Sequence, residues 1–187
     1  MVSGPQGPLR ILVVCTGNVC RSAFAHHYLA AHLDSAAFAV ASAGVGWHSD
    51  LVVPPENHAI GARYGISLDT HQGRFAASAV ARETDLILTA TKDHRRALLE
   101  ETPAALKRCF TILEFTALLD ASGRRPGPDP AAWRELIRDL ATRRETVQAR
   151  DLPDPYGLAF TAYEEMARLL VPALDVIVAA ARPQAAG

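Results

Sequence analysis

The sequence predicts an α/β fold, a single-domain four-stranded parallel sheet with helices on both faces and a phosphate-binding loop after the first strand. Three observations lead to this prediction. Short apolar runs alternate with amphipathic helical patterns along the chain, which is typical of parallel strands joined by helical crossovers. The length of 187 residues suits one domain with a sizeable core. The first apolar run leads directly into a short loop and then a helical pattern, an arrangement that binds anions.

Four apolar runs are predicted to form the strands. The first, Leu9–Val14, has the composition of a buried strand, and the second runs toward Gly44, where it ends. In chain order the predicted strands are Leu9–Val14, Ala37–Ser42, Asp85–Thr89 and Cys109–Leu113.

Helical spacing of apolar residues predicts the segments between the strands. In the first of them Phe24, Tyr28 and Leu29 share one side, and in the second Pro55 lies near the start and Gly65 at the stop. The predicted helices are Arg21–Leu33, Pro54–Tyr64, Arg74–Ala81, Lys92–Glu100, Glu114–Leu119, Ala131–Ala149 and a long final helix that begins at Tyr156 or Gly157, contains Pro172 and ends at about Ala181.

The domain is predicted to span residues 9–181, with a disordered N-terminal tail at 1–8 and a C-terminal tail at 182–187. The first residues lack a basic segment followed by an apolar stretch, so they do not form a secretory signal. A proline- and glycine-rich loop opens an insertion at about 121–150. The helix within it, Ala131–Ala149, either shapes access to a neighbouring site or packs on the outside of the domain.

Composition excludes several classes of protein. A net charge of −1 argues against a nucleic-acid partner, and no apolar run approaches the ~20 residues that cross a membrane. Three cysteines do not make a disulfide framework, which favours a reducing, cytoplasmic location. The seven histidines are scattered, and the adjacent His26 and His27 should point in different directions, at or near the surface. The sequence therefore predicts no metal site and no cofactor.

Residues 15–22 read Cys-Thr-Gly-Asn-Val-Cys-Arg-Ser. A strand–loop–helix junction directs backbone N–H groups and the positive end of a helix dipole at one spot, which binds an oxyanion. Gly17 and Asn18 can adopt left-handed conformations that such a loop needs. Cys15 would lie at the floor of this cradle, Arg21 at its rim, and Ser22 within hydrogen-bond reach of the sulfur. The implied chemistry is attack of sulfur on a bound phosphoryl group.

Together with three further segments, this loop resembles the low-molecular-weight protein tyrosine phosphatases of the bacterial type. Ser42-Ala-Gly resembles the family's Ser-Ala-Gly after the second strand, and His71 to Arg74 resembles its His-x-x-Arg segment. Asp154-Pro-Tyr-Gly resembles its Asp-Pro-aromatic element. The four segments occur in the family's order, and the resemblance extends from about Leu9 to the last helix.

The resemblance implies metal-independent hydrolysis through a phosphocysteine intermediate. Cys15 is the expected nucleophile, and Arg21 would hold two phosphoryl oxygens. Asp154 would protonate the leaving oxygen and then activate water, with Asp151 as the local rival for this role. The loop residues expected to bind phosphate are Thr16, Gly17, Asn18, Val19, Cys20, Arg21 and Ser22.

Further roles follow from the same resemblance. Ser42 and His71 would form a network that supports the loop, or an ordinary polar pair at a strand end. Trp47 and Tyr156 would form the substrate rim, or simply pack. The expected supporting network is Asn18, Ser22, Ser42 and His71.

Two loop residues bear on specificity and regulation. Val19 favours phosphotyrosine, because the related protein-arginine phosphatases carry Thr at this position and an aliphatic side chain offers no hydroxyl to a guanidinium. Cys20 could form a reversible disulfide with Cys15 that protects the thiolate from irreversible oxidation.

Other functions stay open. The alternatives are a phosphatase for a small molecule such as a sugar phosphate or biosynthetic intermediate, an arsenate reductase on the same fold, and a catalytically inactive phosphate-binding module. Cys109, the only thiol beyond the loop, is expected to be buried, which disfavours an internal cysteine relay. The expected partner is a phosphotyrosine protein or a small phosphorylated substrate, with no nucleic acid and no membrane. We expect a monomer or a weak dimer.

Overall fold

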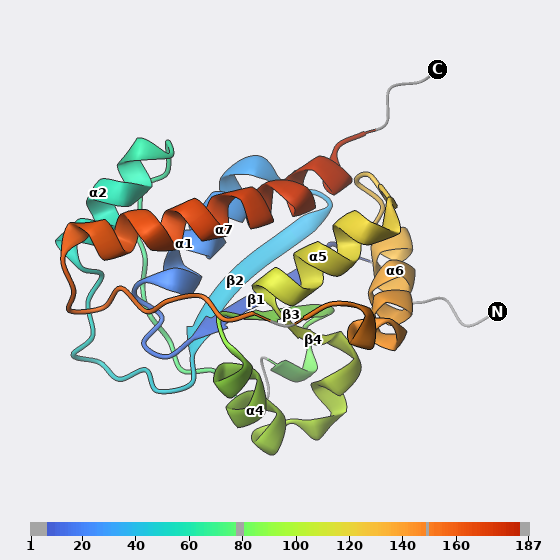
Figure 1. The fold of residues 1–187 in the computed structure, drawn as a ribbon, viewed down its shortest axis with the longest axis horizontal. Helices are drawn as coiled ribbons and strands as arrows, with labels where there is room; N and C mark the ends of the chain where they lie inside the picture. The colour runs from blue at the N-terminus through green and yellow to red at the C-terminus, as the bar shows by residue number, and fades with distance from the viewer. Residues whose placement is uncertain (1–6, 78–80, 149, 184–187) are drawn as a thin grey trace.

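The computed structural model describes residues 7–77, 81–148 and 150–183. They form an α/β fold around a four-stranded parallel sheet with the strand order β2-β1-β3-β4 (Figure 1), which confirms the predicted fold class. The strands are β1 Leu9–Cys15, β2 Phe38–Gly44, β3 Leu86–Thr89 and β4 Cys109–Thr111.

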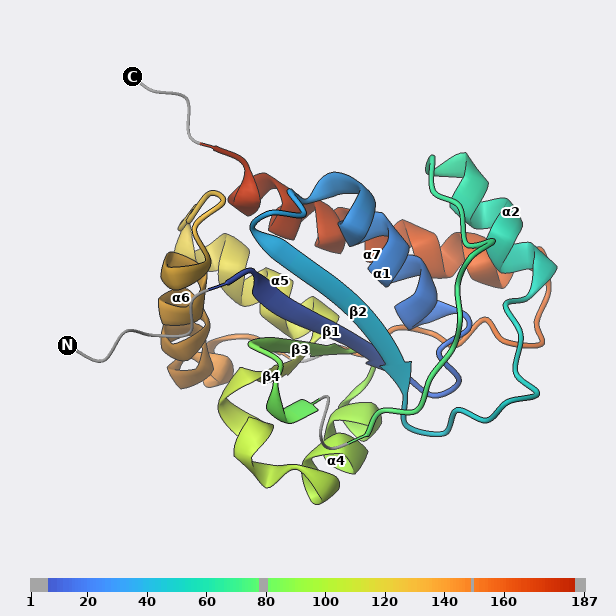
Figure 2. The same ribbon diagram turned by 180° about the vertical axis from the view of Figure 1, so that it is seen from behind.

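The register brings the strand ends to one edge of the sheet. Cys15 at the end of β1 pairs with Gly44 at the end of β2, and Val14 pairs with Thr89 at the end of β3. All four strands are parallel, so their carboxyl ends meet at this edge, where open α/β sheets bind ligands. The β1 and β2 arrows point away from α6 and toward this edge in Figure 2.

Helices cover both faces of the sheet. The α-helices are α1 Arg21–His32, α2 Pro55–Arg63, α4 Lys92–Glu101, α5 Ile112–Ser122, α6 Pro130–Thr142 and α7 Phe160–Ala181, with 3-10 helices η1 Pro103–Arg108 and η2 Arg144–Thr146. Helices α1, α5 and α7 pack over one face and enclose the larger core, while α4 and η1 cover the other (Figures 1 and 2). The larger core includes Phe24, Leu29, Phe115 and Leu174, and the smaller one includes Ile87 and Leu98.

The strand and helix boundaries near β4 differ from the prediction. The strand predicted at Cys109–Leu113 ends at Thr111, because Thr111 caps α5. Its hydroxyl accepts from the N–H of Glu114 at 3.2 Å, and the Glu114 carboxylate accepts from the N–H of Thr111 at 3.1 Å. This capping box starts the helix early, so the predicted Glu114–Leu119 is only part of α5.

The segment predicted as the helix Arg74–Ala81 begins in extended conformation. Phe75 forms a parallel bridge with Gly44, flanked by hydrogen bonds from the Gly44 N–H to Arg74 O and from the Ala76 N–H to Gly44 O. Sheet pairing therefore overrides helix formation at the start of this segment. The rest of the predicted helix falls largely on residues 78–80, outside the described residues.

The final helix also begins later than predicted. Gly157 adopts a left-handed conformation with φ 73°, which the interior of an α-helix excludes, so α7 starts at Phe160 rather than at Tyr156 or Gly157. It continues to Ala181 as predicted, with Pro172 on its exposed side.

The predicted helix Ala131–Ala149 is shorter, because α6 ends at Thr142 and η2 follows. Contacts with distant segments end the helix early. Arg144 donates to the carbonyl oxygens of Leu106 and Cys109, and its guanidinium lies 4.0 Å from the centroid of the Phe110 ring. These contacts turn the chain back toward the sheet. Residue 149 lies outside the described residues.

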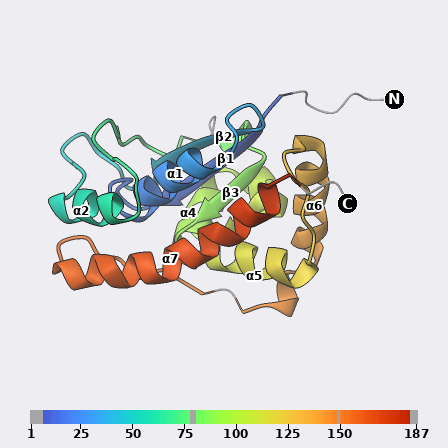
Figure 3. The same cartoon turned by 90° about the horizontal axis from the view of Figure 1, so that it is seen from above.

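Helix α6 lies at the amino edge of the sheet, opposite the carboxyl edge and opposite α2 (Figure 3). Trp133 is fully buried and donates to the Gly127 carbonyl oxygen at 2.8 Å. Arg134 binds Asp85, just before β3, and the carbonyl oxygen of Pro8, just before β1. Helix α6 therefore packs on the outside of the domain, away from the carboxyl edge of the sheet.

Most of each predicted tail lies outside the described residues, which begin at Gly7 and end at Pro183. Among the described helices, none combines the length and apolar character that a membrane crossing requires.

Candidate active site

Residues 15–22 connect β1 to α1 at the carboxyl edge. Asn18 is fully buried and has φ 55°, the left-handed conformation that the sequence predicted, whereas Gly17 does not share it. Cys20 precedes α1 and makes no side-chain cap, so the first N–H groups of the helix have no cap from that side chain. The loop therefore presents backbone donors and the positive end of the α1 dipole.

The Cys15 sulfur lies at the base of the loop, where its side chain is 2% exposed. It is 3.0 Å from the Ser22 hydroxyl oxygen, which also accepts a hydrogen bond from the Asn18 amide at 3.0 Å. Because that oxygen already accepts from Asn18, its own proton is free to point at the sulfur. A donated hydrogen bond of this kind stabilises a thiolate over a thiol.

Arg21 supplies the cation of the site and is 4% exposed. Its guanidinium binds the Asp154 carboxylate at 2.5 Å and approaches the Leu152 carbonyl oxygen at 3.5 Å. The Nε–H has no hydrogen-bond partner, although a buried donor left unpaired costs about 1–3 kcal/mol. An oxyanion above Cys15 would satisfy it.

The two candidate acids lie in different environments. Asp154 is half-exposed, lines the cavity over Cys15 and accepts from the N–H of Tyr156. Asp151 instead accepts from the N–H of Lys92 at 2.8 Å, at the start of α4, and does not line the cavity. The segment is tied to the sheet by a hydrogen bond from the Leu152 N–H to the Ala90 carbonyl oxygen.

A cavity of about 200 Å³ opens above Cys15. Tyr156 stands at its rim and is 52% exposed. Trp47, predicted at the same rim, lines a neighbouring hollow instead, because its indole packs against Gly73, where a Cβ would come within 2.3 Å of the indole nitrogen. The residues that line the cavity are Cys15, Thr16, Gly17, Val19, Cys20, Arg21, Gly46, His48, Leu51, Asp154 and Tyr156.

The predicted network around Asn18 forms with one change. His71 donates from Nε2 to the Asn18 carbonyl oxygen at 2.8 Å, and the N–H of Arg74 donates to the Asn18 side chain at 3.0 Å. The Ser42 hydroxyl lies against Nδ1 of His26 at 3.1 Å, and the Ser42 carbonyl oxygen accepts from the Arg74 side chain. Direct support of the loop by the Ser42 hydroxyl is therefore not what the structure shows.

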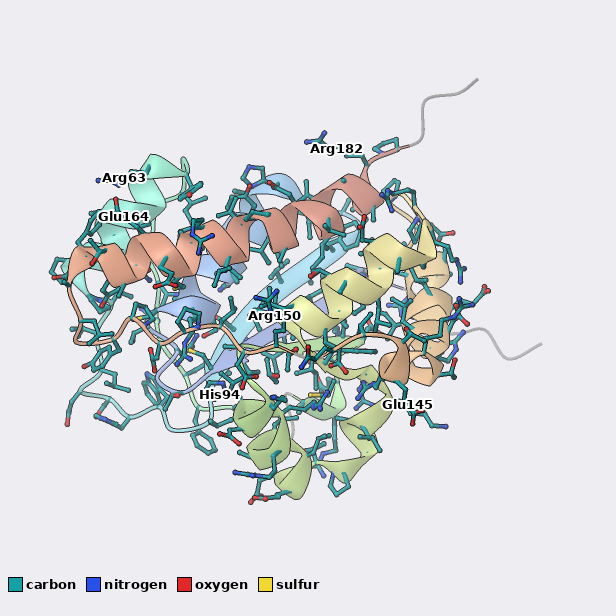
Figure 4. The ribbon with its side chains drawn as sticks, in the orientation of Figure 1. Arg63, His94, Glu145, Arg150, Glu164 and Arg182 are labelled. Carbon is teal, nitrogen blue, oxygen red and sulfur yellow. The ribbon has the colours of Figure 1, made fainter. Side chains whose placement is uncertain are left out.

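Asn57 and His94 also hold the loop, and sequence reasoning missed both. Asn57 on α2 donates to the carbonyl oxygens of Val19 and Cys20. His94 lies near the start of α4 (Figure 4), with Nε2 at 2.8 Å from the Thr16 hydroxyl. Burial and the charge of Arg21 lower the pKa of His94 to about 4, so it adds no positive charge at neutral pH.

Cys20 differs from Cys15 in its surroundings. It is buried and faces the Tyr163 hydroxyl at 4.0 Å. Burial, followed by the proximity of Cys15, raises the pKa of Cys20 to about 12. Cys20 is therefore a thiol at neutral pH, which leaves Cys15 as the candidate nucleophile of the loop.

Gly44 allows the loop to approach the end of β2. A Cβ at Gly44 would lie 2.3 Å from the Thr16 carbonyl oxygen and 3.0 Å from the Asn18 nitrogen, both of them backbone atoms. Gly44→Ala is expected to lower the free energy of unfolding by about 1–3 kcal/mol, because the loop backbone must shift, and to weaken phosphate binding. Chemical denaturation and phosphate titration would measure the two effects.

Gly46→Ala is the matched control for that substitution, since its Cβ would lie 3.3 Å from the Thr16 methyl group and 3.9 Å from the Thr16 carbonyl oxygen, with no backbone clash. Equal stability losses in the two variants would contradict the role assigned to Gly44.

The model of the family "Low molecular weight phosphotyrosine protein phosphatase" matches residues 10–135. The chain is 41% identical to the low molecular weight protein-tyrosine-phosphatase Etp of Escherichia coli K12 over 162 residues, which cover 86% of each protein. It is 39% identical to Wzb of Salmonella typhi over 94 residues, 50% of this chain and 62% of that protein, so this match spans less than two thirds of the relative's length.

A solved structure shares the fold. The YwlE arginine phosphatase from Geobacillus stearothermophilus superposes with a TM-score of 0.69 and 24% identity, over 91% of this chain and 91% of that one. At this level of identity the likeness establishes the fold alone.

Proposed function

Because the chain belongs to the low molecular weight phosphotyrosine protein phosphatase family, we propose that it hydrolyses phosphotyrosine and other aryl phosphate monoesters through a phosphocysteine on Cys15. The observation that carries the proposal is the buried Arg21 guanidinium, whose Nε–H is unpaired beside Cys15 and Asp154 in one cavity. A nucleophile, an anion-binding donor and an acid therefore surround the same space.

In the first step of the proposed reaction, a phosphoryl group takes the place of Asp154 on the Arg21 guanidinium. Its oxygens accept from Arg21 and from the loop N–H groups, which gain strength as the transition state forms. The Cys15 sulfur attacks phosphorus, and the bond from phosphorus to the leaving oxygen breaks. Asp154 donates a proton to that oxygen, so the alcohol or phenol leaves neutral.

In the second step, water attacks the phosphocysteine. Asp154, now a carboxylate, accepts a proton from the water, and the bond between phosphorus and sulfur breaks. Inorganic phosphate leaves and the Cys15 thiolate returns. Protein groups alone supply the nucleophile, the charge stabilisation and the proton transfer in this proposal.

The proposal needs Cys15 in its reduced form. All three cysteines are free thiols in the structure, and a reducing compartment such as the cytoplasm would keep Cys15 reactive. Cys109 is fully buried, as the sequence predicted, and Cys20 is also buried. These positions do not favour an internal relay for arsenate reduction, which needs thiols that exchange with one another.

The cavity favours aryl phosphates in two ways. Its base lies at the nearly inaccessible Cys15, so a long phosphotyrosine side chain reaches the sulfur more easily than a short phosphoserine. Val19 lines the wall with an aliphatic side chain and gives no hydroxyl to a phosphoarginine guanidinium. Stacking on Tyr156 would add a modest term, of order 0.5–1.5 kcal/mol.

We expect kcat/KM for a phosphotyrosine peptide to exceed that for matched phosphoserine and phosphoarginine peptides and for free sugar phosphates. Reach and the pKa of the leaving group should dominate this preference. The measurement is phosphate release across the matched panel, with arsenate reduction assayed separately. A non-aromatic phosphate that outperforms phosphotyrosine by about tenfold, equivalent to ~1.4 kcal/mol of barrier, would favour the small-molecule alternative. No turnover of any phosphate would favour an inactive binding module.

A further inference from the structure

Three histidine side chains gather outside the cavity, behind the loop. His26 and His27 come from α1, and His71 comes from the segment before Phe75. The ring centroids are 4.9 Å apart for His26 and His27, and 5.2 Å for His27 and His71. One ring nitrogen from each residue lies within 4.8 Å of those of the other two. The expectation that His26 and His27 point in different directions is therefore wrong.

The hydrogen bonds of His71 fix which of its nitrogens has a free lone pair. Nε2 lies 2.8 Å from the Asn18 carbonyl oxygen, which can only accept, so the proton of a neutral His71 is on Nε2. Nδ1 is then an acceptor, and it faces Nε2 of His27 at 3.1 Å. A histidine that donates one N–H to a backbone carbonyl and offers the other nitrogen is oriented as metal-binding histidines are.

All three rings are neutral at physiological pH. Burial is the largest cause of the lowered pKa of each, and it brings the pKa of His26 to about 4, together with the neighbouring His27, His71 and Arg74. Neutral imidazole is the form that binds metal ions. The three side chains are only partly buried, so an ion can reach them from solvent.

We propose that His26, His27 and His71 bind one divalent transition-metal ion, with Zn²⁺ as the representative. Imidazole nitrogen favours Zn²⁺, Cu²⁺ and Ni²⁺ over Mg²⁺ and Ca²⁺, which prefer oxygen ligands. Three histidines with a water molecule in the fourth position make a known zinc coordination set.

The geometry requires a small rearrangement. A tetrahedral Zn²⁺ with bonds of about 2.0–2.1 Å separates its ligand atoms by about 3.3 Å. Nε2 of His27 and Nδ1 of His71 are already 3.1 Å apart, so the ion would replace the proton between them. His27 would change to the tautomer protonated on Nδ1, and no net proton is released. His26 must move closer, within the 4.8 Å that now encloses the three nitrogens.

Two neighbouring groups set the strength of the site. The Ser42 hydroxyl contacts Nδ1 of His26 and orients its ring. The Arg74 guanidinium lies close enough to lower the pKa of both His26 and His71, and its charge opposes a second cation. We therefore expect weaker binding than at a closed four-ligand zinc site.

Calorimetric titration of the full chain with ZnCl₂ tests the site. Because a cysteine thiolate is itself a zinc ligand, Cys15→Ser is titrated beside the wild type. We expect one ion per chain at the histidine cluster in both proteins, and an affinity lower by at least about tenfold in His26→Gln and His27→Gln. His32→Gln, also on α1 and outside the cluster, is the matched control and should keep the wild-type affinity.

NMR spectroscopy of the wild-type protein tests the same site without any substitution, so its result does not depend on whether a variant folds. Zn²⁺ should shift the imidazole NMR signals of His26, His27 and His71 and leave those of His32 and His48 in place. Loss of all zinc binding in Cys15→Ser, unchanged affinity in folded His27→Gln, or unshifted signals of the three histidines would each overturn the proposal. None of these readouts depends on phosphatase activity.

Discussion

Replacing Cys15 by serine is expected to lower turnover of aryl phosphates by on the order of 10⁴-fold or more. A serine hydroxyl holds its proton far more tightly than a thiol, and the Ser22 hydroxyl, 3.0 Å from Sγ, is too weak a base to remove that proton. The phosphate contacts do not involve the sulfur, so the loop N–H groups and Arg21 should still bind phosphate. Steady-state kinetics and phosphate titration measure the two properties separately.

Two controls accompany Cys15→Ser. Cys109→Ala removes a thiol that is fully buried in the smaller core and should retain turnover per folded molecule. A chelator should leave wild-type turnover in place, because the proposed catalysis uses no metal ion. Full activity in Cys15→Ser, or loss of wild-type activity with the chelator, would contradict the mechanism.

The second large effect is expected for Asp154→Ala, which should lower kcat by about 10²–10⁴-fold for a substrate with a poor leaving group. The loss should be smaller for an activated phenol, which leaves without protonation. The variant also removes the carboxylate that binds Arg21 at 2.5 Å in the free protein. Phosphate should therefore bind at least as tightly as in the wild type, which separates a catalytic loss from a damaged site.

Asp151→Ala is the matched comparison for that variant, since Asp151 lies three residues away and binds the start of α4. It should affect stability more than the dependence of rate on the leaving group. A larger kinetic loss in Asp151→Ala than in Asp154→Ala would reverse the assignment of the acid.

The sequence was most informative where structure and chemistry are local. Cys15, Arg21 and Ser22 lie within one strand–loop–helix junction, so their spacing alone places them around a common point. The sheet was predictable for a similar reason, because each strand of a covered parallel sheet reads as an apolar run. Element ends were less predictable, as Thr111 and Gly157 show, because one capping group or one left-handed residue decides them.

Contacts between distant segments were not predictable from spacing. Asn57 lies 37 residues from Cys20, and His94 lies 78 residues from Thr16. A lone asparagine or histidine on a helix carries no signal of what the tertiary fold will bring against it. Thr91, which caps α4 and accepts from the N–H of His94, was the one local hint that this turn is held in a fixed position.

The position of the Trp47 side chain depends on a glycine that is distant in the sequence. Its place after Ser42-Ala-Gly suggested the rim of the cavity, yet the indole occupies the space that Gly73 leaves open. The sequence alone does not predict that a large side chain will pack against a glycine in a distant segment.

The position of both described chain ends has a practical consequence. Arg134 on α6 binds the carbonyl oxygens of Gly7 and Pro8, and the N–H of Gly127 binds Ala180 O near the end of α7. Both described ends therefore lie at the amino edge of the sheet (Figure 1), whereas the cavity above Cys15 lies at the carboxyl edge. A protein anchored to a sensor chip through either end would present its cleft to the flowing solution, so ligand binding can be recorded on the immobilised protein without the support blocking the entrance.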